Sequence, residues 1–362
     1  MGEPKKETPP IGIGIIGTAM WGNRQGGACI EHPLTEIVGI SDIREEAAKD
    51  FSQKQDISVP IFTDFNDLLA MDGLDAVIVT TPNDVHAPIS IAAAQAGKHV
   101  LCQKPMATSI ADAEAMVAAV EKAGVTNMVG YTKRFFNGAR FLHDFFQREE
   151  LGRVYHVRAF YLQDWLSNPK VPILWRLQKD RTGTGSLGDL ASHITDLAQF
   201  IIGEDIVRVT GMMKTFIHER PIAPRSQETG TVDVDDAAMF CAEFENGTMG
   251  VFETSRNATG VGDHWRIEIN AENGSVIYDK VEGRVQLSMR IGPARGAGWI
   301  DLPIPEDKYG VAGAENVHEI DHFAHCIRTG EPAAPNFAEG LRVERVLDAV
   351  VRSSTTGTAI DV

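Results

Sequence analysis

The stretch Val100-Leu101-Cys102-Gln103-Lys104-Pro105 joins a short apolar run to a lysine and a proline. A second apolar run at 76–79 and a helix-period segment at 85–96 precede it, which predicts two parallel strands joined by a helix. A lysine directly after a parallel strand lies at the carboxyl edge of the sheet, where open α/β sheets bind their ligands. A solvated loop lysine would show the same local pattern.

The alternation of strands and helices extends outward from this stretch. It predicts a doubly wound parallel sheet over residues 11–131, preceded by a flexible, proline-rich N-terminus at residues 1–10. The expected strands are 11–16, 36–40, 60–63, 76–79, the run ending at 102, and 127–131. The expected helices are a first one ending near 31, then 45–54, 85–96 and 111–123.

A glycine turn follows the first expected strand. Gly17-Thr18-Ala19-Met20-Trp21-Gly22 fits a dinucleotide-binding fingerprint with alanine in the middle position, whereas the overlapping match at Gly12 and Gly14 lies inside the strand. Pyrophosphate binds to N–H groups at a helix N-terminus, so the turn is the better candidate. We expect cofactor contacts from Gly17, Thr18, Ala19, Met20 and Trp21, although a glycine-rich turn without a ligand is the simpler alternative.

An acidic residue ends the second expected strand. Asp42 is placed to accept hydrogen bonds from the adenosine ribose hydroxyls and would repel a 2′-phosphate, which favours NAD over NADP. Arg44 lies close by in the sequence and could accommodate that phosphate, so NADP remains possible.

A polar cluster closes the strand at 76–79. Thr81, Pro82 and Asn83 follow it, and His86 comes one turn into the next helix. Together with Gln103 and Lys104 at the neighbouring strand end, this cluster is expected to bind ribose or nicotinamide. A plain turn with a helix cap explains Asn83 almost as well.

The second half changes pattern and predicts an α+β domain at residues 132–362. Asn246-Gly247 and Asn273-Gly274 are hairpin signals, so its strands are expected to pair antiparallel. The expected strands are 154–161, 207–217, 237–244, 248–254, 265–271 and 275–279. The expected helices are 137–148, 187–202, 317–328 and 338–353.

The helix at 187–202 carries the chemistry. Asp189 and His193 are four residues apart and share a helix face, where a carboxylate can orient an imidazole that moves a proton. A simple surface pair is an equal alternative. The glycines of Gly183-Thr184-Gly185-Ser186-Leu187-Gly188 also fit the fingerprint, but no strand precedes them, so a second nucleotide site is rejected.

A zinc pattern near the C-terminus is also rejected. His318-Glu319-Ile320-Asp321-His322 matches H-E-x-x-H, and a metalloprotease would be the rival class of enzyme. Nothing else in the sequence supports that class, because the first third is committed to a dinucleotide fold. We expect no metal site.

Composition limits the partners. The net charge of −16 disfavours nucleic acid and anionic membrane surfaces. Four scattered cysteines and the absence of an apolar run of membrane-spanning length predict a soluble, cytoplasmic protein.

With these residues in hand, the chain resembles the glucose–fructose oxidoreductase / inositol dehydrogenase / MocA family of NAD(P)-dependent oxidoreductases over residues 11–362. The resemblance rests on the glycine turn, Thr81-Pro82-Asn83 with His86, Gln103-Lys104-Pro105, Arg134-Phe135, Trp175-Arg176 and the Asp189/His193 segment. It implies an N-terminal Rossmann domain and a C-terminal domain whose open, mainly antiparallel sheet mediates homodimers or homotetramers.

The resemblance also implies roles for individual residues. Hydride transfer would link the nicotinamide to a secondary alcohol of a sugar or cyclitol. Lys104 would hydrogen-bond the reacting oxygen, and His193, backed by Asp189, would be the acid/base. The family usually has glutamate where this chain has Gln103, which removes a negative charge beside Lys104.

Three hypotheses follow: a sugar or polyol dehydrogenase acting on an inositol or anhydrosugar, an NAD-dependent glycosidase with a transient internal oxidation, or a non-catalytic nucleotide-sensing regulator. The presence of Lys104, Asp189 and His193 argues against the regulator. The further candidates for the substrate pocket are Arg134, Asp164, Trp165, Trp175 and Arg176, although core packing explains the tryptophans equally well.

Overall fold

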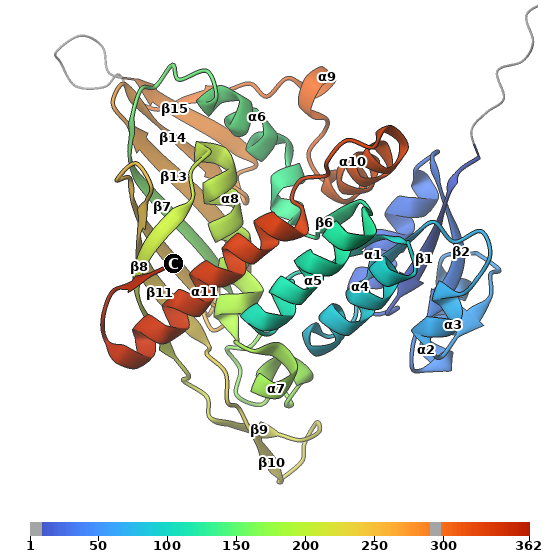
Figure 1. Ribbon diagram of the computed structural model, residues 1–362. Helices are drawn as coiled ribbons and strands as arrows, with labels where there is room; N and C mark the ends of the chain where they lie inside the picture. Colours follow the sequence, from blue (N-terminus) through green and yellow to red (C-terminus); the bar gives the residue numbers. More distant parts are fainter. Residues whose placement is uncertain (1–8, 290–297) are drawn as a thin grey trace, which may run out of the picture.

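The computed structural model describes residues 9–289 and 298–362 and contains two large sheets (Figure 1). The first has six parallel strands in the order β3-β2-β1-β4-β5-β6. Its strands are β1 (Ile11–Ile16), β2 (Thr35–Ser41), β3 (Ile61–Phe62), β4 (Ala76–Val79), β5 (His99–Cys102) and β6 (Asn127–Val129). The order confirms the doubly wound fold, and the central strands β1 and β4 are completely buried.

Helices connect these strands where the apolar periodicity predicted them. They are α1 (Met20–Glu31), α2 (Glu45–Lys54), α3 (Phe65–Leu69), α4 (His86–Gln95), which follows the 3-10 turn η1 (Asn83–Val85), and α5 (Ile110–Ala123). The short helix α3 was not predicted. Its five residues span little more than one turn, too few to show a helical period.

The second sheet has nine strands in the order β16-β15-β14-β13-β7-β12-β11-β8-β17. They are β7 (Val154–Gln163), β8 (Ile206–Lys214), β11 (Ala237–Phe244), β12 (Met249–Ser255), β13 (Asp263–Ala271), β14 (Gly274–Asp279), β15 (Arg284–Met289), β16 (Ile300–Leu302) and β17 (Ile360–Asp361). A small hairpin of β9 (Glu219–Pro221) and β10 (Thr229–Thr231) projects from the body (Figure 1).

Both predicted hairpins form, since β11 pairs with β12 and β13 pairs with β14, each antiparallel. The expectation that all of these strands pair antiparallel is wrong for β7 and β12, which run parallel. A hairpin signal reports only on strands that adjoin in sequence. Helices and four further strands separate β7 from β12, so no turn constrains their relative direction.

One face of the second sheet is covered by helices and the other is open (Figure 1). The helices of this half are α6 (Asn137–Phe146), α7 (Lys179–Thr182), α8 (Ser192–Ile202), α9 (Glu306–Tyr309), α10 (Glu315–Thr329) and α11 (Phe337–Thr356), with the 3-10 turns η2 (Thr132–Phe135) and η3 (Trp175–Leu177). Burial alternates along β11 and β12, which leaves apolar side chains on the open face: Met212, Met239, Cys241, Met249 and Val251.

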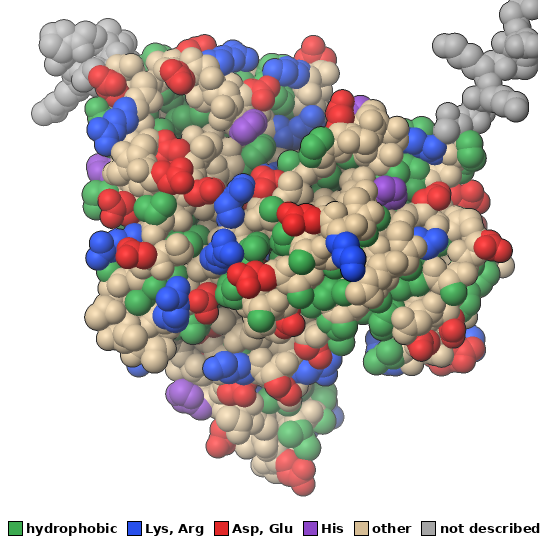
Figure 2. All heavy atoms as spheres, in the orientation of Figure 1, with side chains coloured by type: hydrophobic (Ala, Val, Ile, Leu, Met, Phe, Trp, Pro, Cys, Tyr) green, Lys and Arg blue, Asp and Glu red, His purple; other side chains and the backbone are tan. Residues whose placement is uncertain are grey.

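The acidic composition disfavours partners that need a large basic surface. On the face drawn in Figure 2, acidic and basic side chains are interspersed instead of forming one basic patch. Among the residues described, every helix is too short or too polar to cross a lipid bilayer. The expected flexible N-terminus lies mostly outside the described residues, since only Pro9 and Pro10 of it are described.

Candidate functional site

A cavity of about 650 Å³ lies at the carboxyl edge of the first sheet, where Lys104 was expected. Residues of the first half line one side and residues of the second half line the other. The first-half lining includes Gly17 to Trp21, Ser41 to Arg44, Thr80 to Asn83, and Gln103 to Pro105. The second-half lining includes Trp175, Arg176, Arg181, Thr182, Thr184, Gly185, Asp189 and Arg256.

The glycine turn has the backbone that a dinucleotide requires. Gly17 has φ of +90°, a value that favours glycine, and a β-carbon at Gly22 would collide with the Gly17 carbonyl. Ala19 directly precedes the first turn of α1, and no side chain caps the N–H groups there. The turn therefore leaves backbone donors at the helix N-terminus for a pyrophosphate, and the residues present fit NAD.

Asp42 fastens this turn to the end of β2. One carboxylate oxygen accepts hydrogen bonds from the Thr18 backbone N–H, at 2.9 Å, and from its hydroxyl, at 2.8 Å. The other accepts from the Arg44 N–H at 2.9 Å. The Arg44 side chain is 70% exposed, with Nε 3.8 Å from Asp42. Asp42 therefore holds the glycine turn in place through Thr18. Its contact with the adenosine ribose remains a prediction.

His86 ties two strand ends together. Its Nδ1 lies 2.9 Å from the Pro105 carbonyl oxygen and its Nε2 lies 2.9 Å from that of Thr81. The side chain is buried and does not line the cavity, whereas Thr81, Pro82, Asn83 and Gln103 do. His86 therefore holds the two loops that line the cavity, and its own contact with a cofactor stays a prediction.

Lys104 meets Asp189 across the cavity. Its Nζ donates to the Asp189 carbonyl oxygen and to Oδ1, each at 2.7 Å. Arg256 lies on the other carboxylate oxygen, with Nη1 3.8 Å from Oδ2. Burial alone would raise the pKa of Asp189, but the charges of Lys104, Arg256 and Arg176 hold it well below the usual range.

His193 lies one turn further along the chain, where it is buried and, unlike Asp189, is not part of the cavity lining. It follows a π-helical turn, η4 (Leu187–Ala191), and lies at the start of α8. The rings of Tyr131 and Tyr161 lie 6.3 Å and 6.1 Å from its own. Burial, and then the charges of Lys104 and Lys133, lower its pKa well below the ordinary histidine value.

The expected pairing of Asp189 with His193 is not found. Within the described residues the two side chains share no hydrogen bond, and His193 Nδ1 has no partner. The physical reason is charge, because Lys104 and Arg256 offer the carboxylate a stronger interaction than a neutral imidazole can.

The remaining pocket candidates divide into two groups. Trp175 and Arg176 line the cavity, with the Arg176 guanidinium 4.3 Å from the Trp175 ring centroid. Arg134 does not line it. Its guanidinium is buried against Asp196, at 2.6 Å, and Glu339, at 2.9 Å.

Asp164 and Trp165 also lie away from the cavity lining. The Asp164 carboxylate accepts from the Gly260 N–H at 3.2 Å, and the Trp165 indole donates to Gln163 at 2.8 Å.

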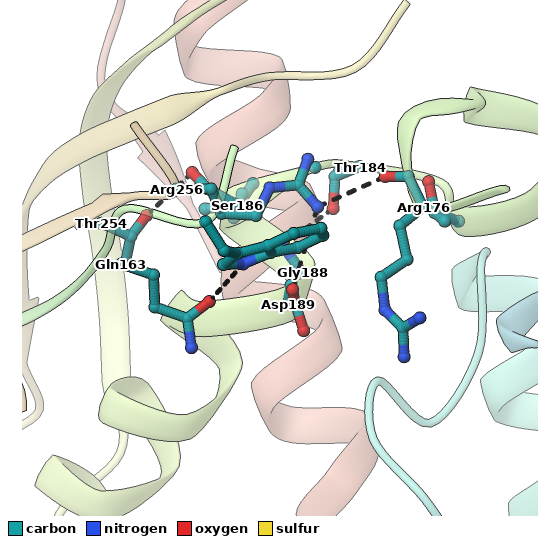
Figure 3. A network of polar contacts seen from close by, with 12 residues as sticks. Gln163, Arg176, Thr184, Ser186, Gly188, Asp189, Thr254 and Arg256 are labelled. Atoms are coloured by element: carbon teal, nitrogen blue, oxygen red, sulfur yellow. Dashed lines mark hydrogen bonds and ion pairs between the residues drawn. The ribbon is translucent and has the colours of Figure 1, made fainter. Parts of the chain in front are cut away.

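Arg256 is a site residue that sequence reasoning missed. It directly follows β12 and is 1% exposed. It donates to the carbonyl oxygens of Arg176, at 3.3 Å, and Asp235, at 3.2 Å (Figure 3). A polar Ser255-Arg256-Asn257 run after an apolar strand is the signal that could have found it.

The glutamate of the zinc pattern is engaged in another contact. Glu319 is fully buried on α10, where its carboxyl accepts from Gln25 of α1 at 2.5 Å. Over the residues described, no cluster of three or more histidine, cysteine or acidic side chains is placed to hold a metal ion.

Comparisons with known proteins agree with this geometry. The model "Oxidoreductase family, NAD-binding Rossmann fold" matches residues 11–131, and "GFO/IDH/MocA C-terminal domain" matches residues 139–277. Levoglucosan dehydrogenase of Pseudarthrobacter phenanthrenivorans is 32% identical over 91% of this chain and 90% of its own length. Myo-inositol 2-dehydrogenase of Thermotoga maritima is 27% identical over 91% of this chain and 90% of its own.

A solved structure extends the similarity to three dimensions. Levoglucosan dehydrogenase in complex with NADH and L-sorbose has a TM-score of 0.93 and 29% identity, with 98% of this chain and 99% of that chain covered. Fold, cavity and relatives together define an NAD-binding oxidoreductase. The chain belongs to the glucose–fructose oxidoreductase / inositol dehydrogenase / MocA family.

Proposed function

We propose that the protein is a dehydrogenase that oxidises a secondary alcohol of a sugar or cyclitol with NAD, an inositol or an anhydrosugar being the expected substrate type. The observation that carries this proposal is the approach of Lys104 to Asp189 at the cavity, with His193 one turn away. Relatives named for levoglucosan and myo-inositol support the choice of substrate class.

Gly17 to Trp21 would hold the pyrophosphate, and Asp42 the adenosine ribose, of the cofactor. Thr81, Pro82, Asn83 and Gln103 line the cavity next to Lys104 and would face the nicotinamide half. When bound, the nicotinamide supplies the acceptor for the hydride. Asp42 favours NAD, while the exposed Arg44 leaves NADP possible.

The protein has to orient a hydroxyl and remove its proton. Lys104 is placed to donate a hydrogen bond to the reacting oxygen, because Asp189 and its carbonyl hold the ammonium at the cavity. His193 is neutral at ordinary pH, since burial and two lysines lower its pKa, so its imidazole is free to accept the hydroxyl proton. Asp189 then acts through Lys104 as a positioning residue.

A panel of sugars tests this function. Inositols, hexoses and anhydrosugars are offered with NAD, and NADH is followed by its absorbance. Net NADH from at least one sugar or cyclitol is expected. Cleavage of a glycoside without net NADH would instead indicate the glycosidase, and NAD binding without either reaction would indicate a nucleotide-sensing regulator.

We further propose that the open face of the second sheet joins copies of this chain into a homodimer or homotetramer. Met212, Met239, Met249 and Val251 are 68%, 48%, 62% and 51% exposed there. Met212 faces Met239 across β8 and β11, and Val251 faces Cys241 across β11 and β12, so the apolar side chains are contiguous. The exposed free thiol of Cys241 fits a reducing, cytoplasmic location.

A further inference from the structure

Glu344 is a buried carboxyl group that has no basic partner among the described residues. It lies on α11 and is 9% exposed. The two other acidic residues of that helix each pair with an arginine. They are Glu339, which binds Arg134, and Asp348, which binds Arg352. Burial of an ionised carboxylate costs free energy unless a counter-charge or hydrogen bonds replace its hydration. Glu344 therefore depends on hydrogen bonds from uncharged groups.

Two backbone N–H groups of the Lys104 loop, residues 103–109 between β5 and α5, supply those hydrogen bonds. The N–H of Met106 donates to Glu344 Oε1 at 2.8 Å, and the N–H of Ala107 also donates to this carboxyl group. Met106 and Ala107 are 0% and 3% exposed, so water does not replace the carboxyl group as their acceptor. Because an unpaired buried N–H is costly, the carboxyl group stabilises this conformation of the loop.

Three successive residues of the Lys104 loop are fastened to three different elements. The Lys104 side chain crosses the cavity to η4. The Pro105 carbonyl oxygen lies 2.9 Å from Nδ1 of His86, at the start of α4. The Met106 N–H binds Glu344 on α11. Because proline has a fixed φ, little rotation remains between the lysine and the N–H that Glu344 holds. A movement at Met106 is therefore passed on to Lys104.

The helix that carries Glu344 packs directly on the Lys104 loop. A β-carbon at Gly340, one turn before Glu344, would lie 2.7 Å from the Met106 sulfur, so glycine lets α11 come this close. Further along α11, the Ser353 hydroxyl accepts the N–H of Gly211 on β8 at 3.0 Å. The helix thus contacts α5 in the first half of the chain and β8 in the second (Figure 1). The carboxyl group that holds the loop belongs to an element anchored on the second sheet.

We propose that Glu344 is a positioning residue for Lys104. Its carboxylate holds the two N–H groups that follow Pro105 and thereby keeps the lysine ammonium at the cavity, where the reacting oxygen of the substrate would bind. This inference rests on the proposed function. A carboxylate offers acceptors on both oxygens, whereas an amide would turn its NH2 group toward one of the two N–H groups. The ionised form of Glu344 is therefore the form that fixes the loop.

Steady-state kinetics of Glu344→Gln and Glu344→Met test this role in the wild-type and Lys104→Met backgrounds. Loss of the acceptors lets the lysine shift, and a misplacement of about 1 Å can cost about 100-fold in rate. The kcat of Glu344→Met is therefore expected to fall about 10- to 100-fold, and that of Glu344→Gln, which keeps one acceptor, by less. In the Lys104→Met background neither variant should lower kcat/KM by more than about twofold, because the side chain that Glu344 positions is absent.

Ser353→Ala is the matched control, because it removes a different buried acceptor of α11, one that holds β8 and not the Lys104 loop. It is expected to lower the Tm while kcat stays within about twofold of the wild-type value. Equal losses from Glu344→Met in both backgrounds would show a general effect on the fold and overturn the proposal. An unchanged kcat of Glu344→Met in an active protein overturns this inference alone. A wild type that oxidises no sugar overturns the proposed function, and this inference with it.

The pH dependence of kcat gives a second test, which holds even if Glu344→Met fails to fold. Burial raises the pKa of Glu344 to about 7, and no charged side chain among the described residues contributes to the shift. The titratable groups that face Glu344 are Cys102 on β5 and Tyr131 after β6. Burial raises the pKa of both, so they stay neutral near pH 7.

Glu344 is therefore ionised above about pH 8 and takes up a proton as the pH falls through 7. Wild-type kcat is expected to be level above about pH 8 and to fall between pH 7 and 6. The amide of Glu344→Gln does not titrate, so this fall is expected to be absent in that variant. A wild-type kcat that is level from pH 5 to 9, or a fall of equal size in Glu344→Gln, contradicts the inference.

Discussion

The Lys104 ammonium lies 2.7 Å from the carboxylate and 2.7 Å from the carbonyl oxygen of the same residue, Asp189. The Lys104 side chain makes both contacts, and it thus joins two parts of the chain that are 85 residues apart. The lysine side chain is 8% exposed and that of Asp189 is 25% exposed, so the pair is screened less by solvent than a surface ion pair would be.

This pair is expected to act as a unit. Asp189→Asn and Lys104→Met should each lower kcat/KM by about 10²–10⁴-fold, and the double variant should be no worse than the poorer single variant. The measurement is a double-mutant cycle on kcat/KM. Losses that multiply in the double variant would show that the two residues act independently. As a control, Glu46→Gln, on the exposed surface of α2, should combine with either variant without further loss.

His193→Ala is expected to lower turnover by about two to four orders of magnitude while NADH affinity is retained, as for loss of a general acid/base. Because burial and the two lysines lower the pKa of His193, its neutral form persists below pH 6.5. The rate of wild-type oxidation should therefore show no change between pH 6.5 and 8 that is due to protonation of His193. Ser192→Ala, which removes a neighbouring buried hydroxyl without a partner, is the control. Near-normal turnover of His193→Ala would make the histidine structural.

Asp42→Ala is expected to weaken NADH binding by more than about tenfold and NADPH binding far less, which fluorescence titration of both cofactors would measure. Thr18→Val separates anchoring from recognition, because it removes one hydrogen bond to Asp42 and leaves the carboxylate in place. A smaller loss is expected for that variant. A wild type that binds NADPH more tightly than NADH would point to Arg44 instead.

Glu319 is expected to make stability depend on pH. Burial raises its pKa to about 8, whereas the unfolded chain ionises the group near pH 4.3. The folded protein therefore keeps a proton that the unfolded chain releases, and this contribution to stability is lost as pH rises from about 4.5 through 8, by up to ~1.4 kcal/mol per pH unit. Glu319→Gln should show a smaller fall in Tm between pH 5 and 8. Glu121→Gln, on an exposed face of α5, should leave the fall unchanged.

Charged residues on the open sheet face are expected to dissociate the assembly. Met239→Lys combined with Val251→Lys should give a monomer in sedimentation experiments, since each lysine would have to lose its hydration in an apolar contact. Val281→Lys is the matched control, because Val281 is 65% exposed in the turn between β14 and β15. A wild type that is already monomeric would refute the proposed interface.

The sequence was most informative where structure is local. The Rossmann half could be predicted because each apolar strand is followed at once by its helix, and the two asparagine–glycine turns predicted both hairpins. Strands as short as β9, β10, β16 and β17 carry no measurable period and were missed.

The partners in the site depend instead on contacts between distant segments. Asp189 turns to Lys104 and Arg256 rather than to His193, and Lys133 meets Tyr161 and Trp265 only because three elements converge. No spacing rule applies to residues brought together in this way. Arg134 shows the same limit, because the acidic partners that occupy it come from α8 and α11.

The position of β7 in the second sheet has a consequence for how the chain is made. β7 is the first strand of that sheet to be synthesised, yet its two neighbours are β12 and β13, which come much later in the chain. At ordinary translation rates the most central strand of the sheet waits on the order of 5 to 20 seconds for its first partner to leave the ribosome. α8 packs against β7 in the folded protein and is made during that interval, so it is available to cover the apolar face of the strand before β12 and β13 arrive.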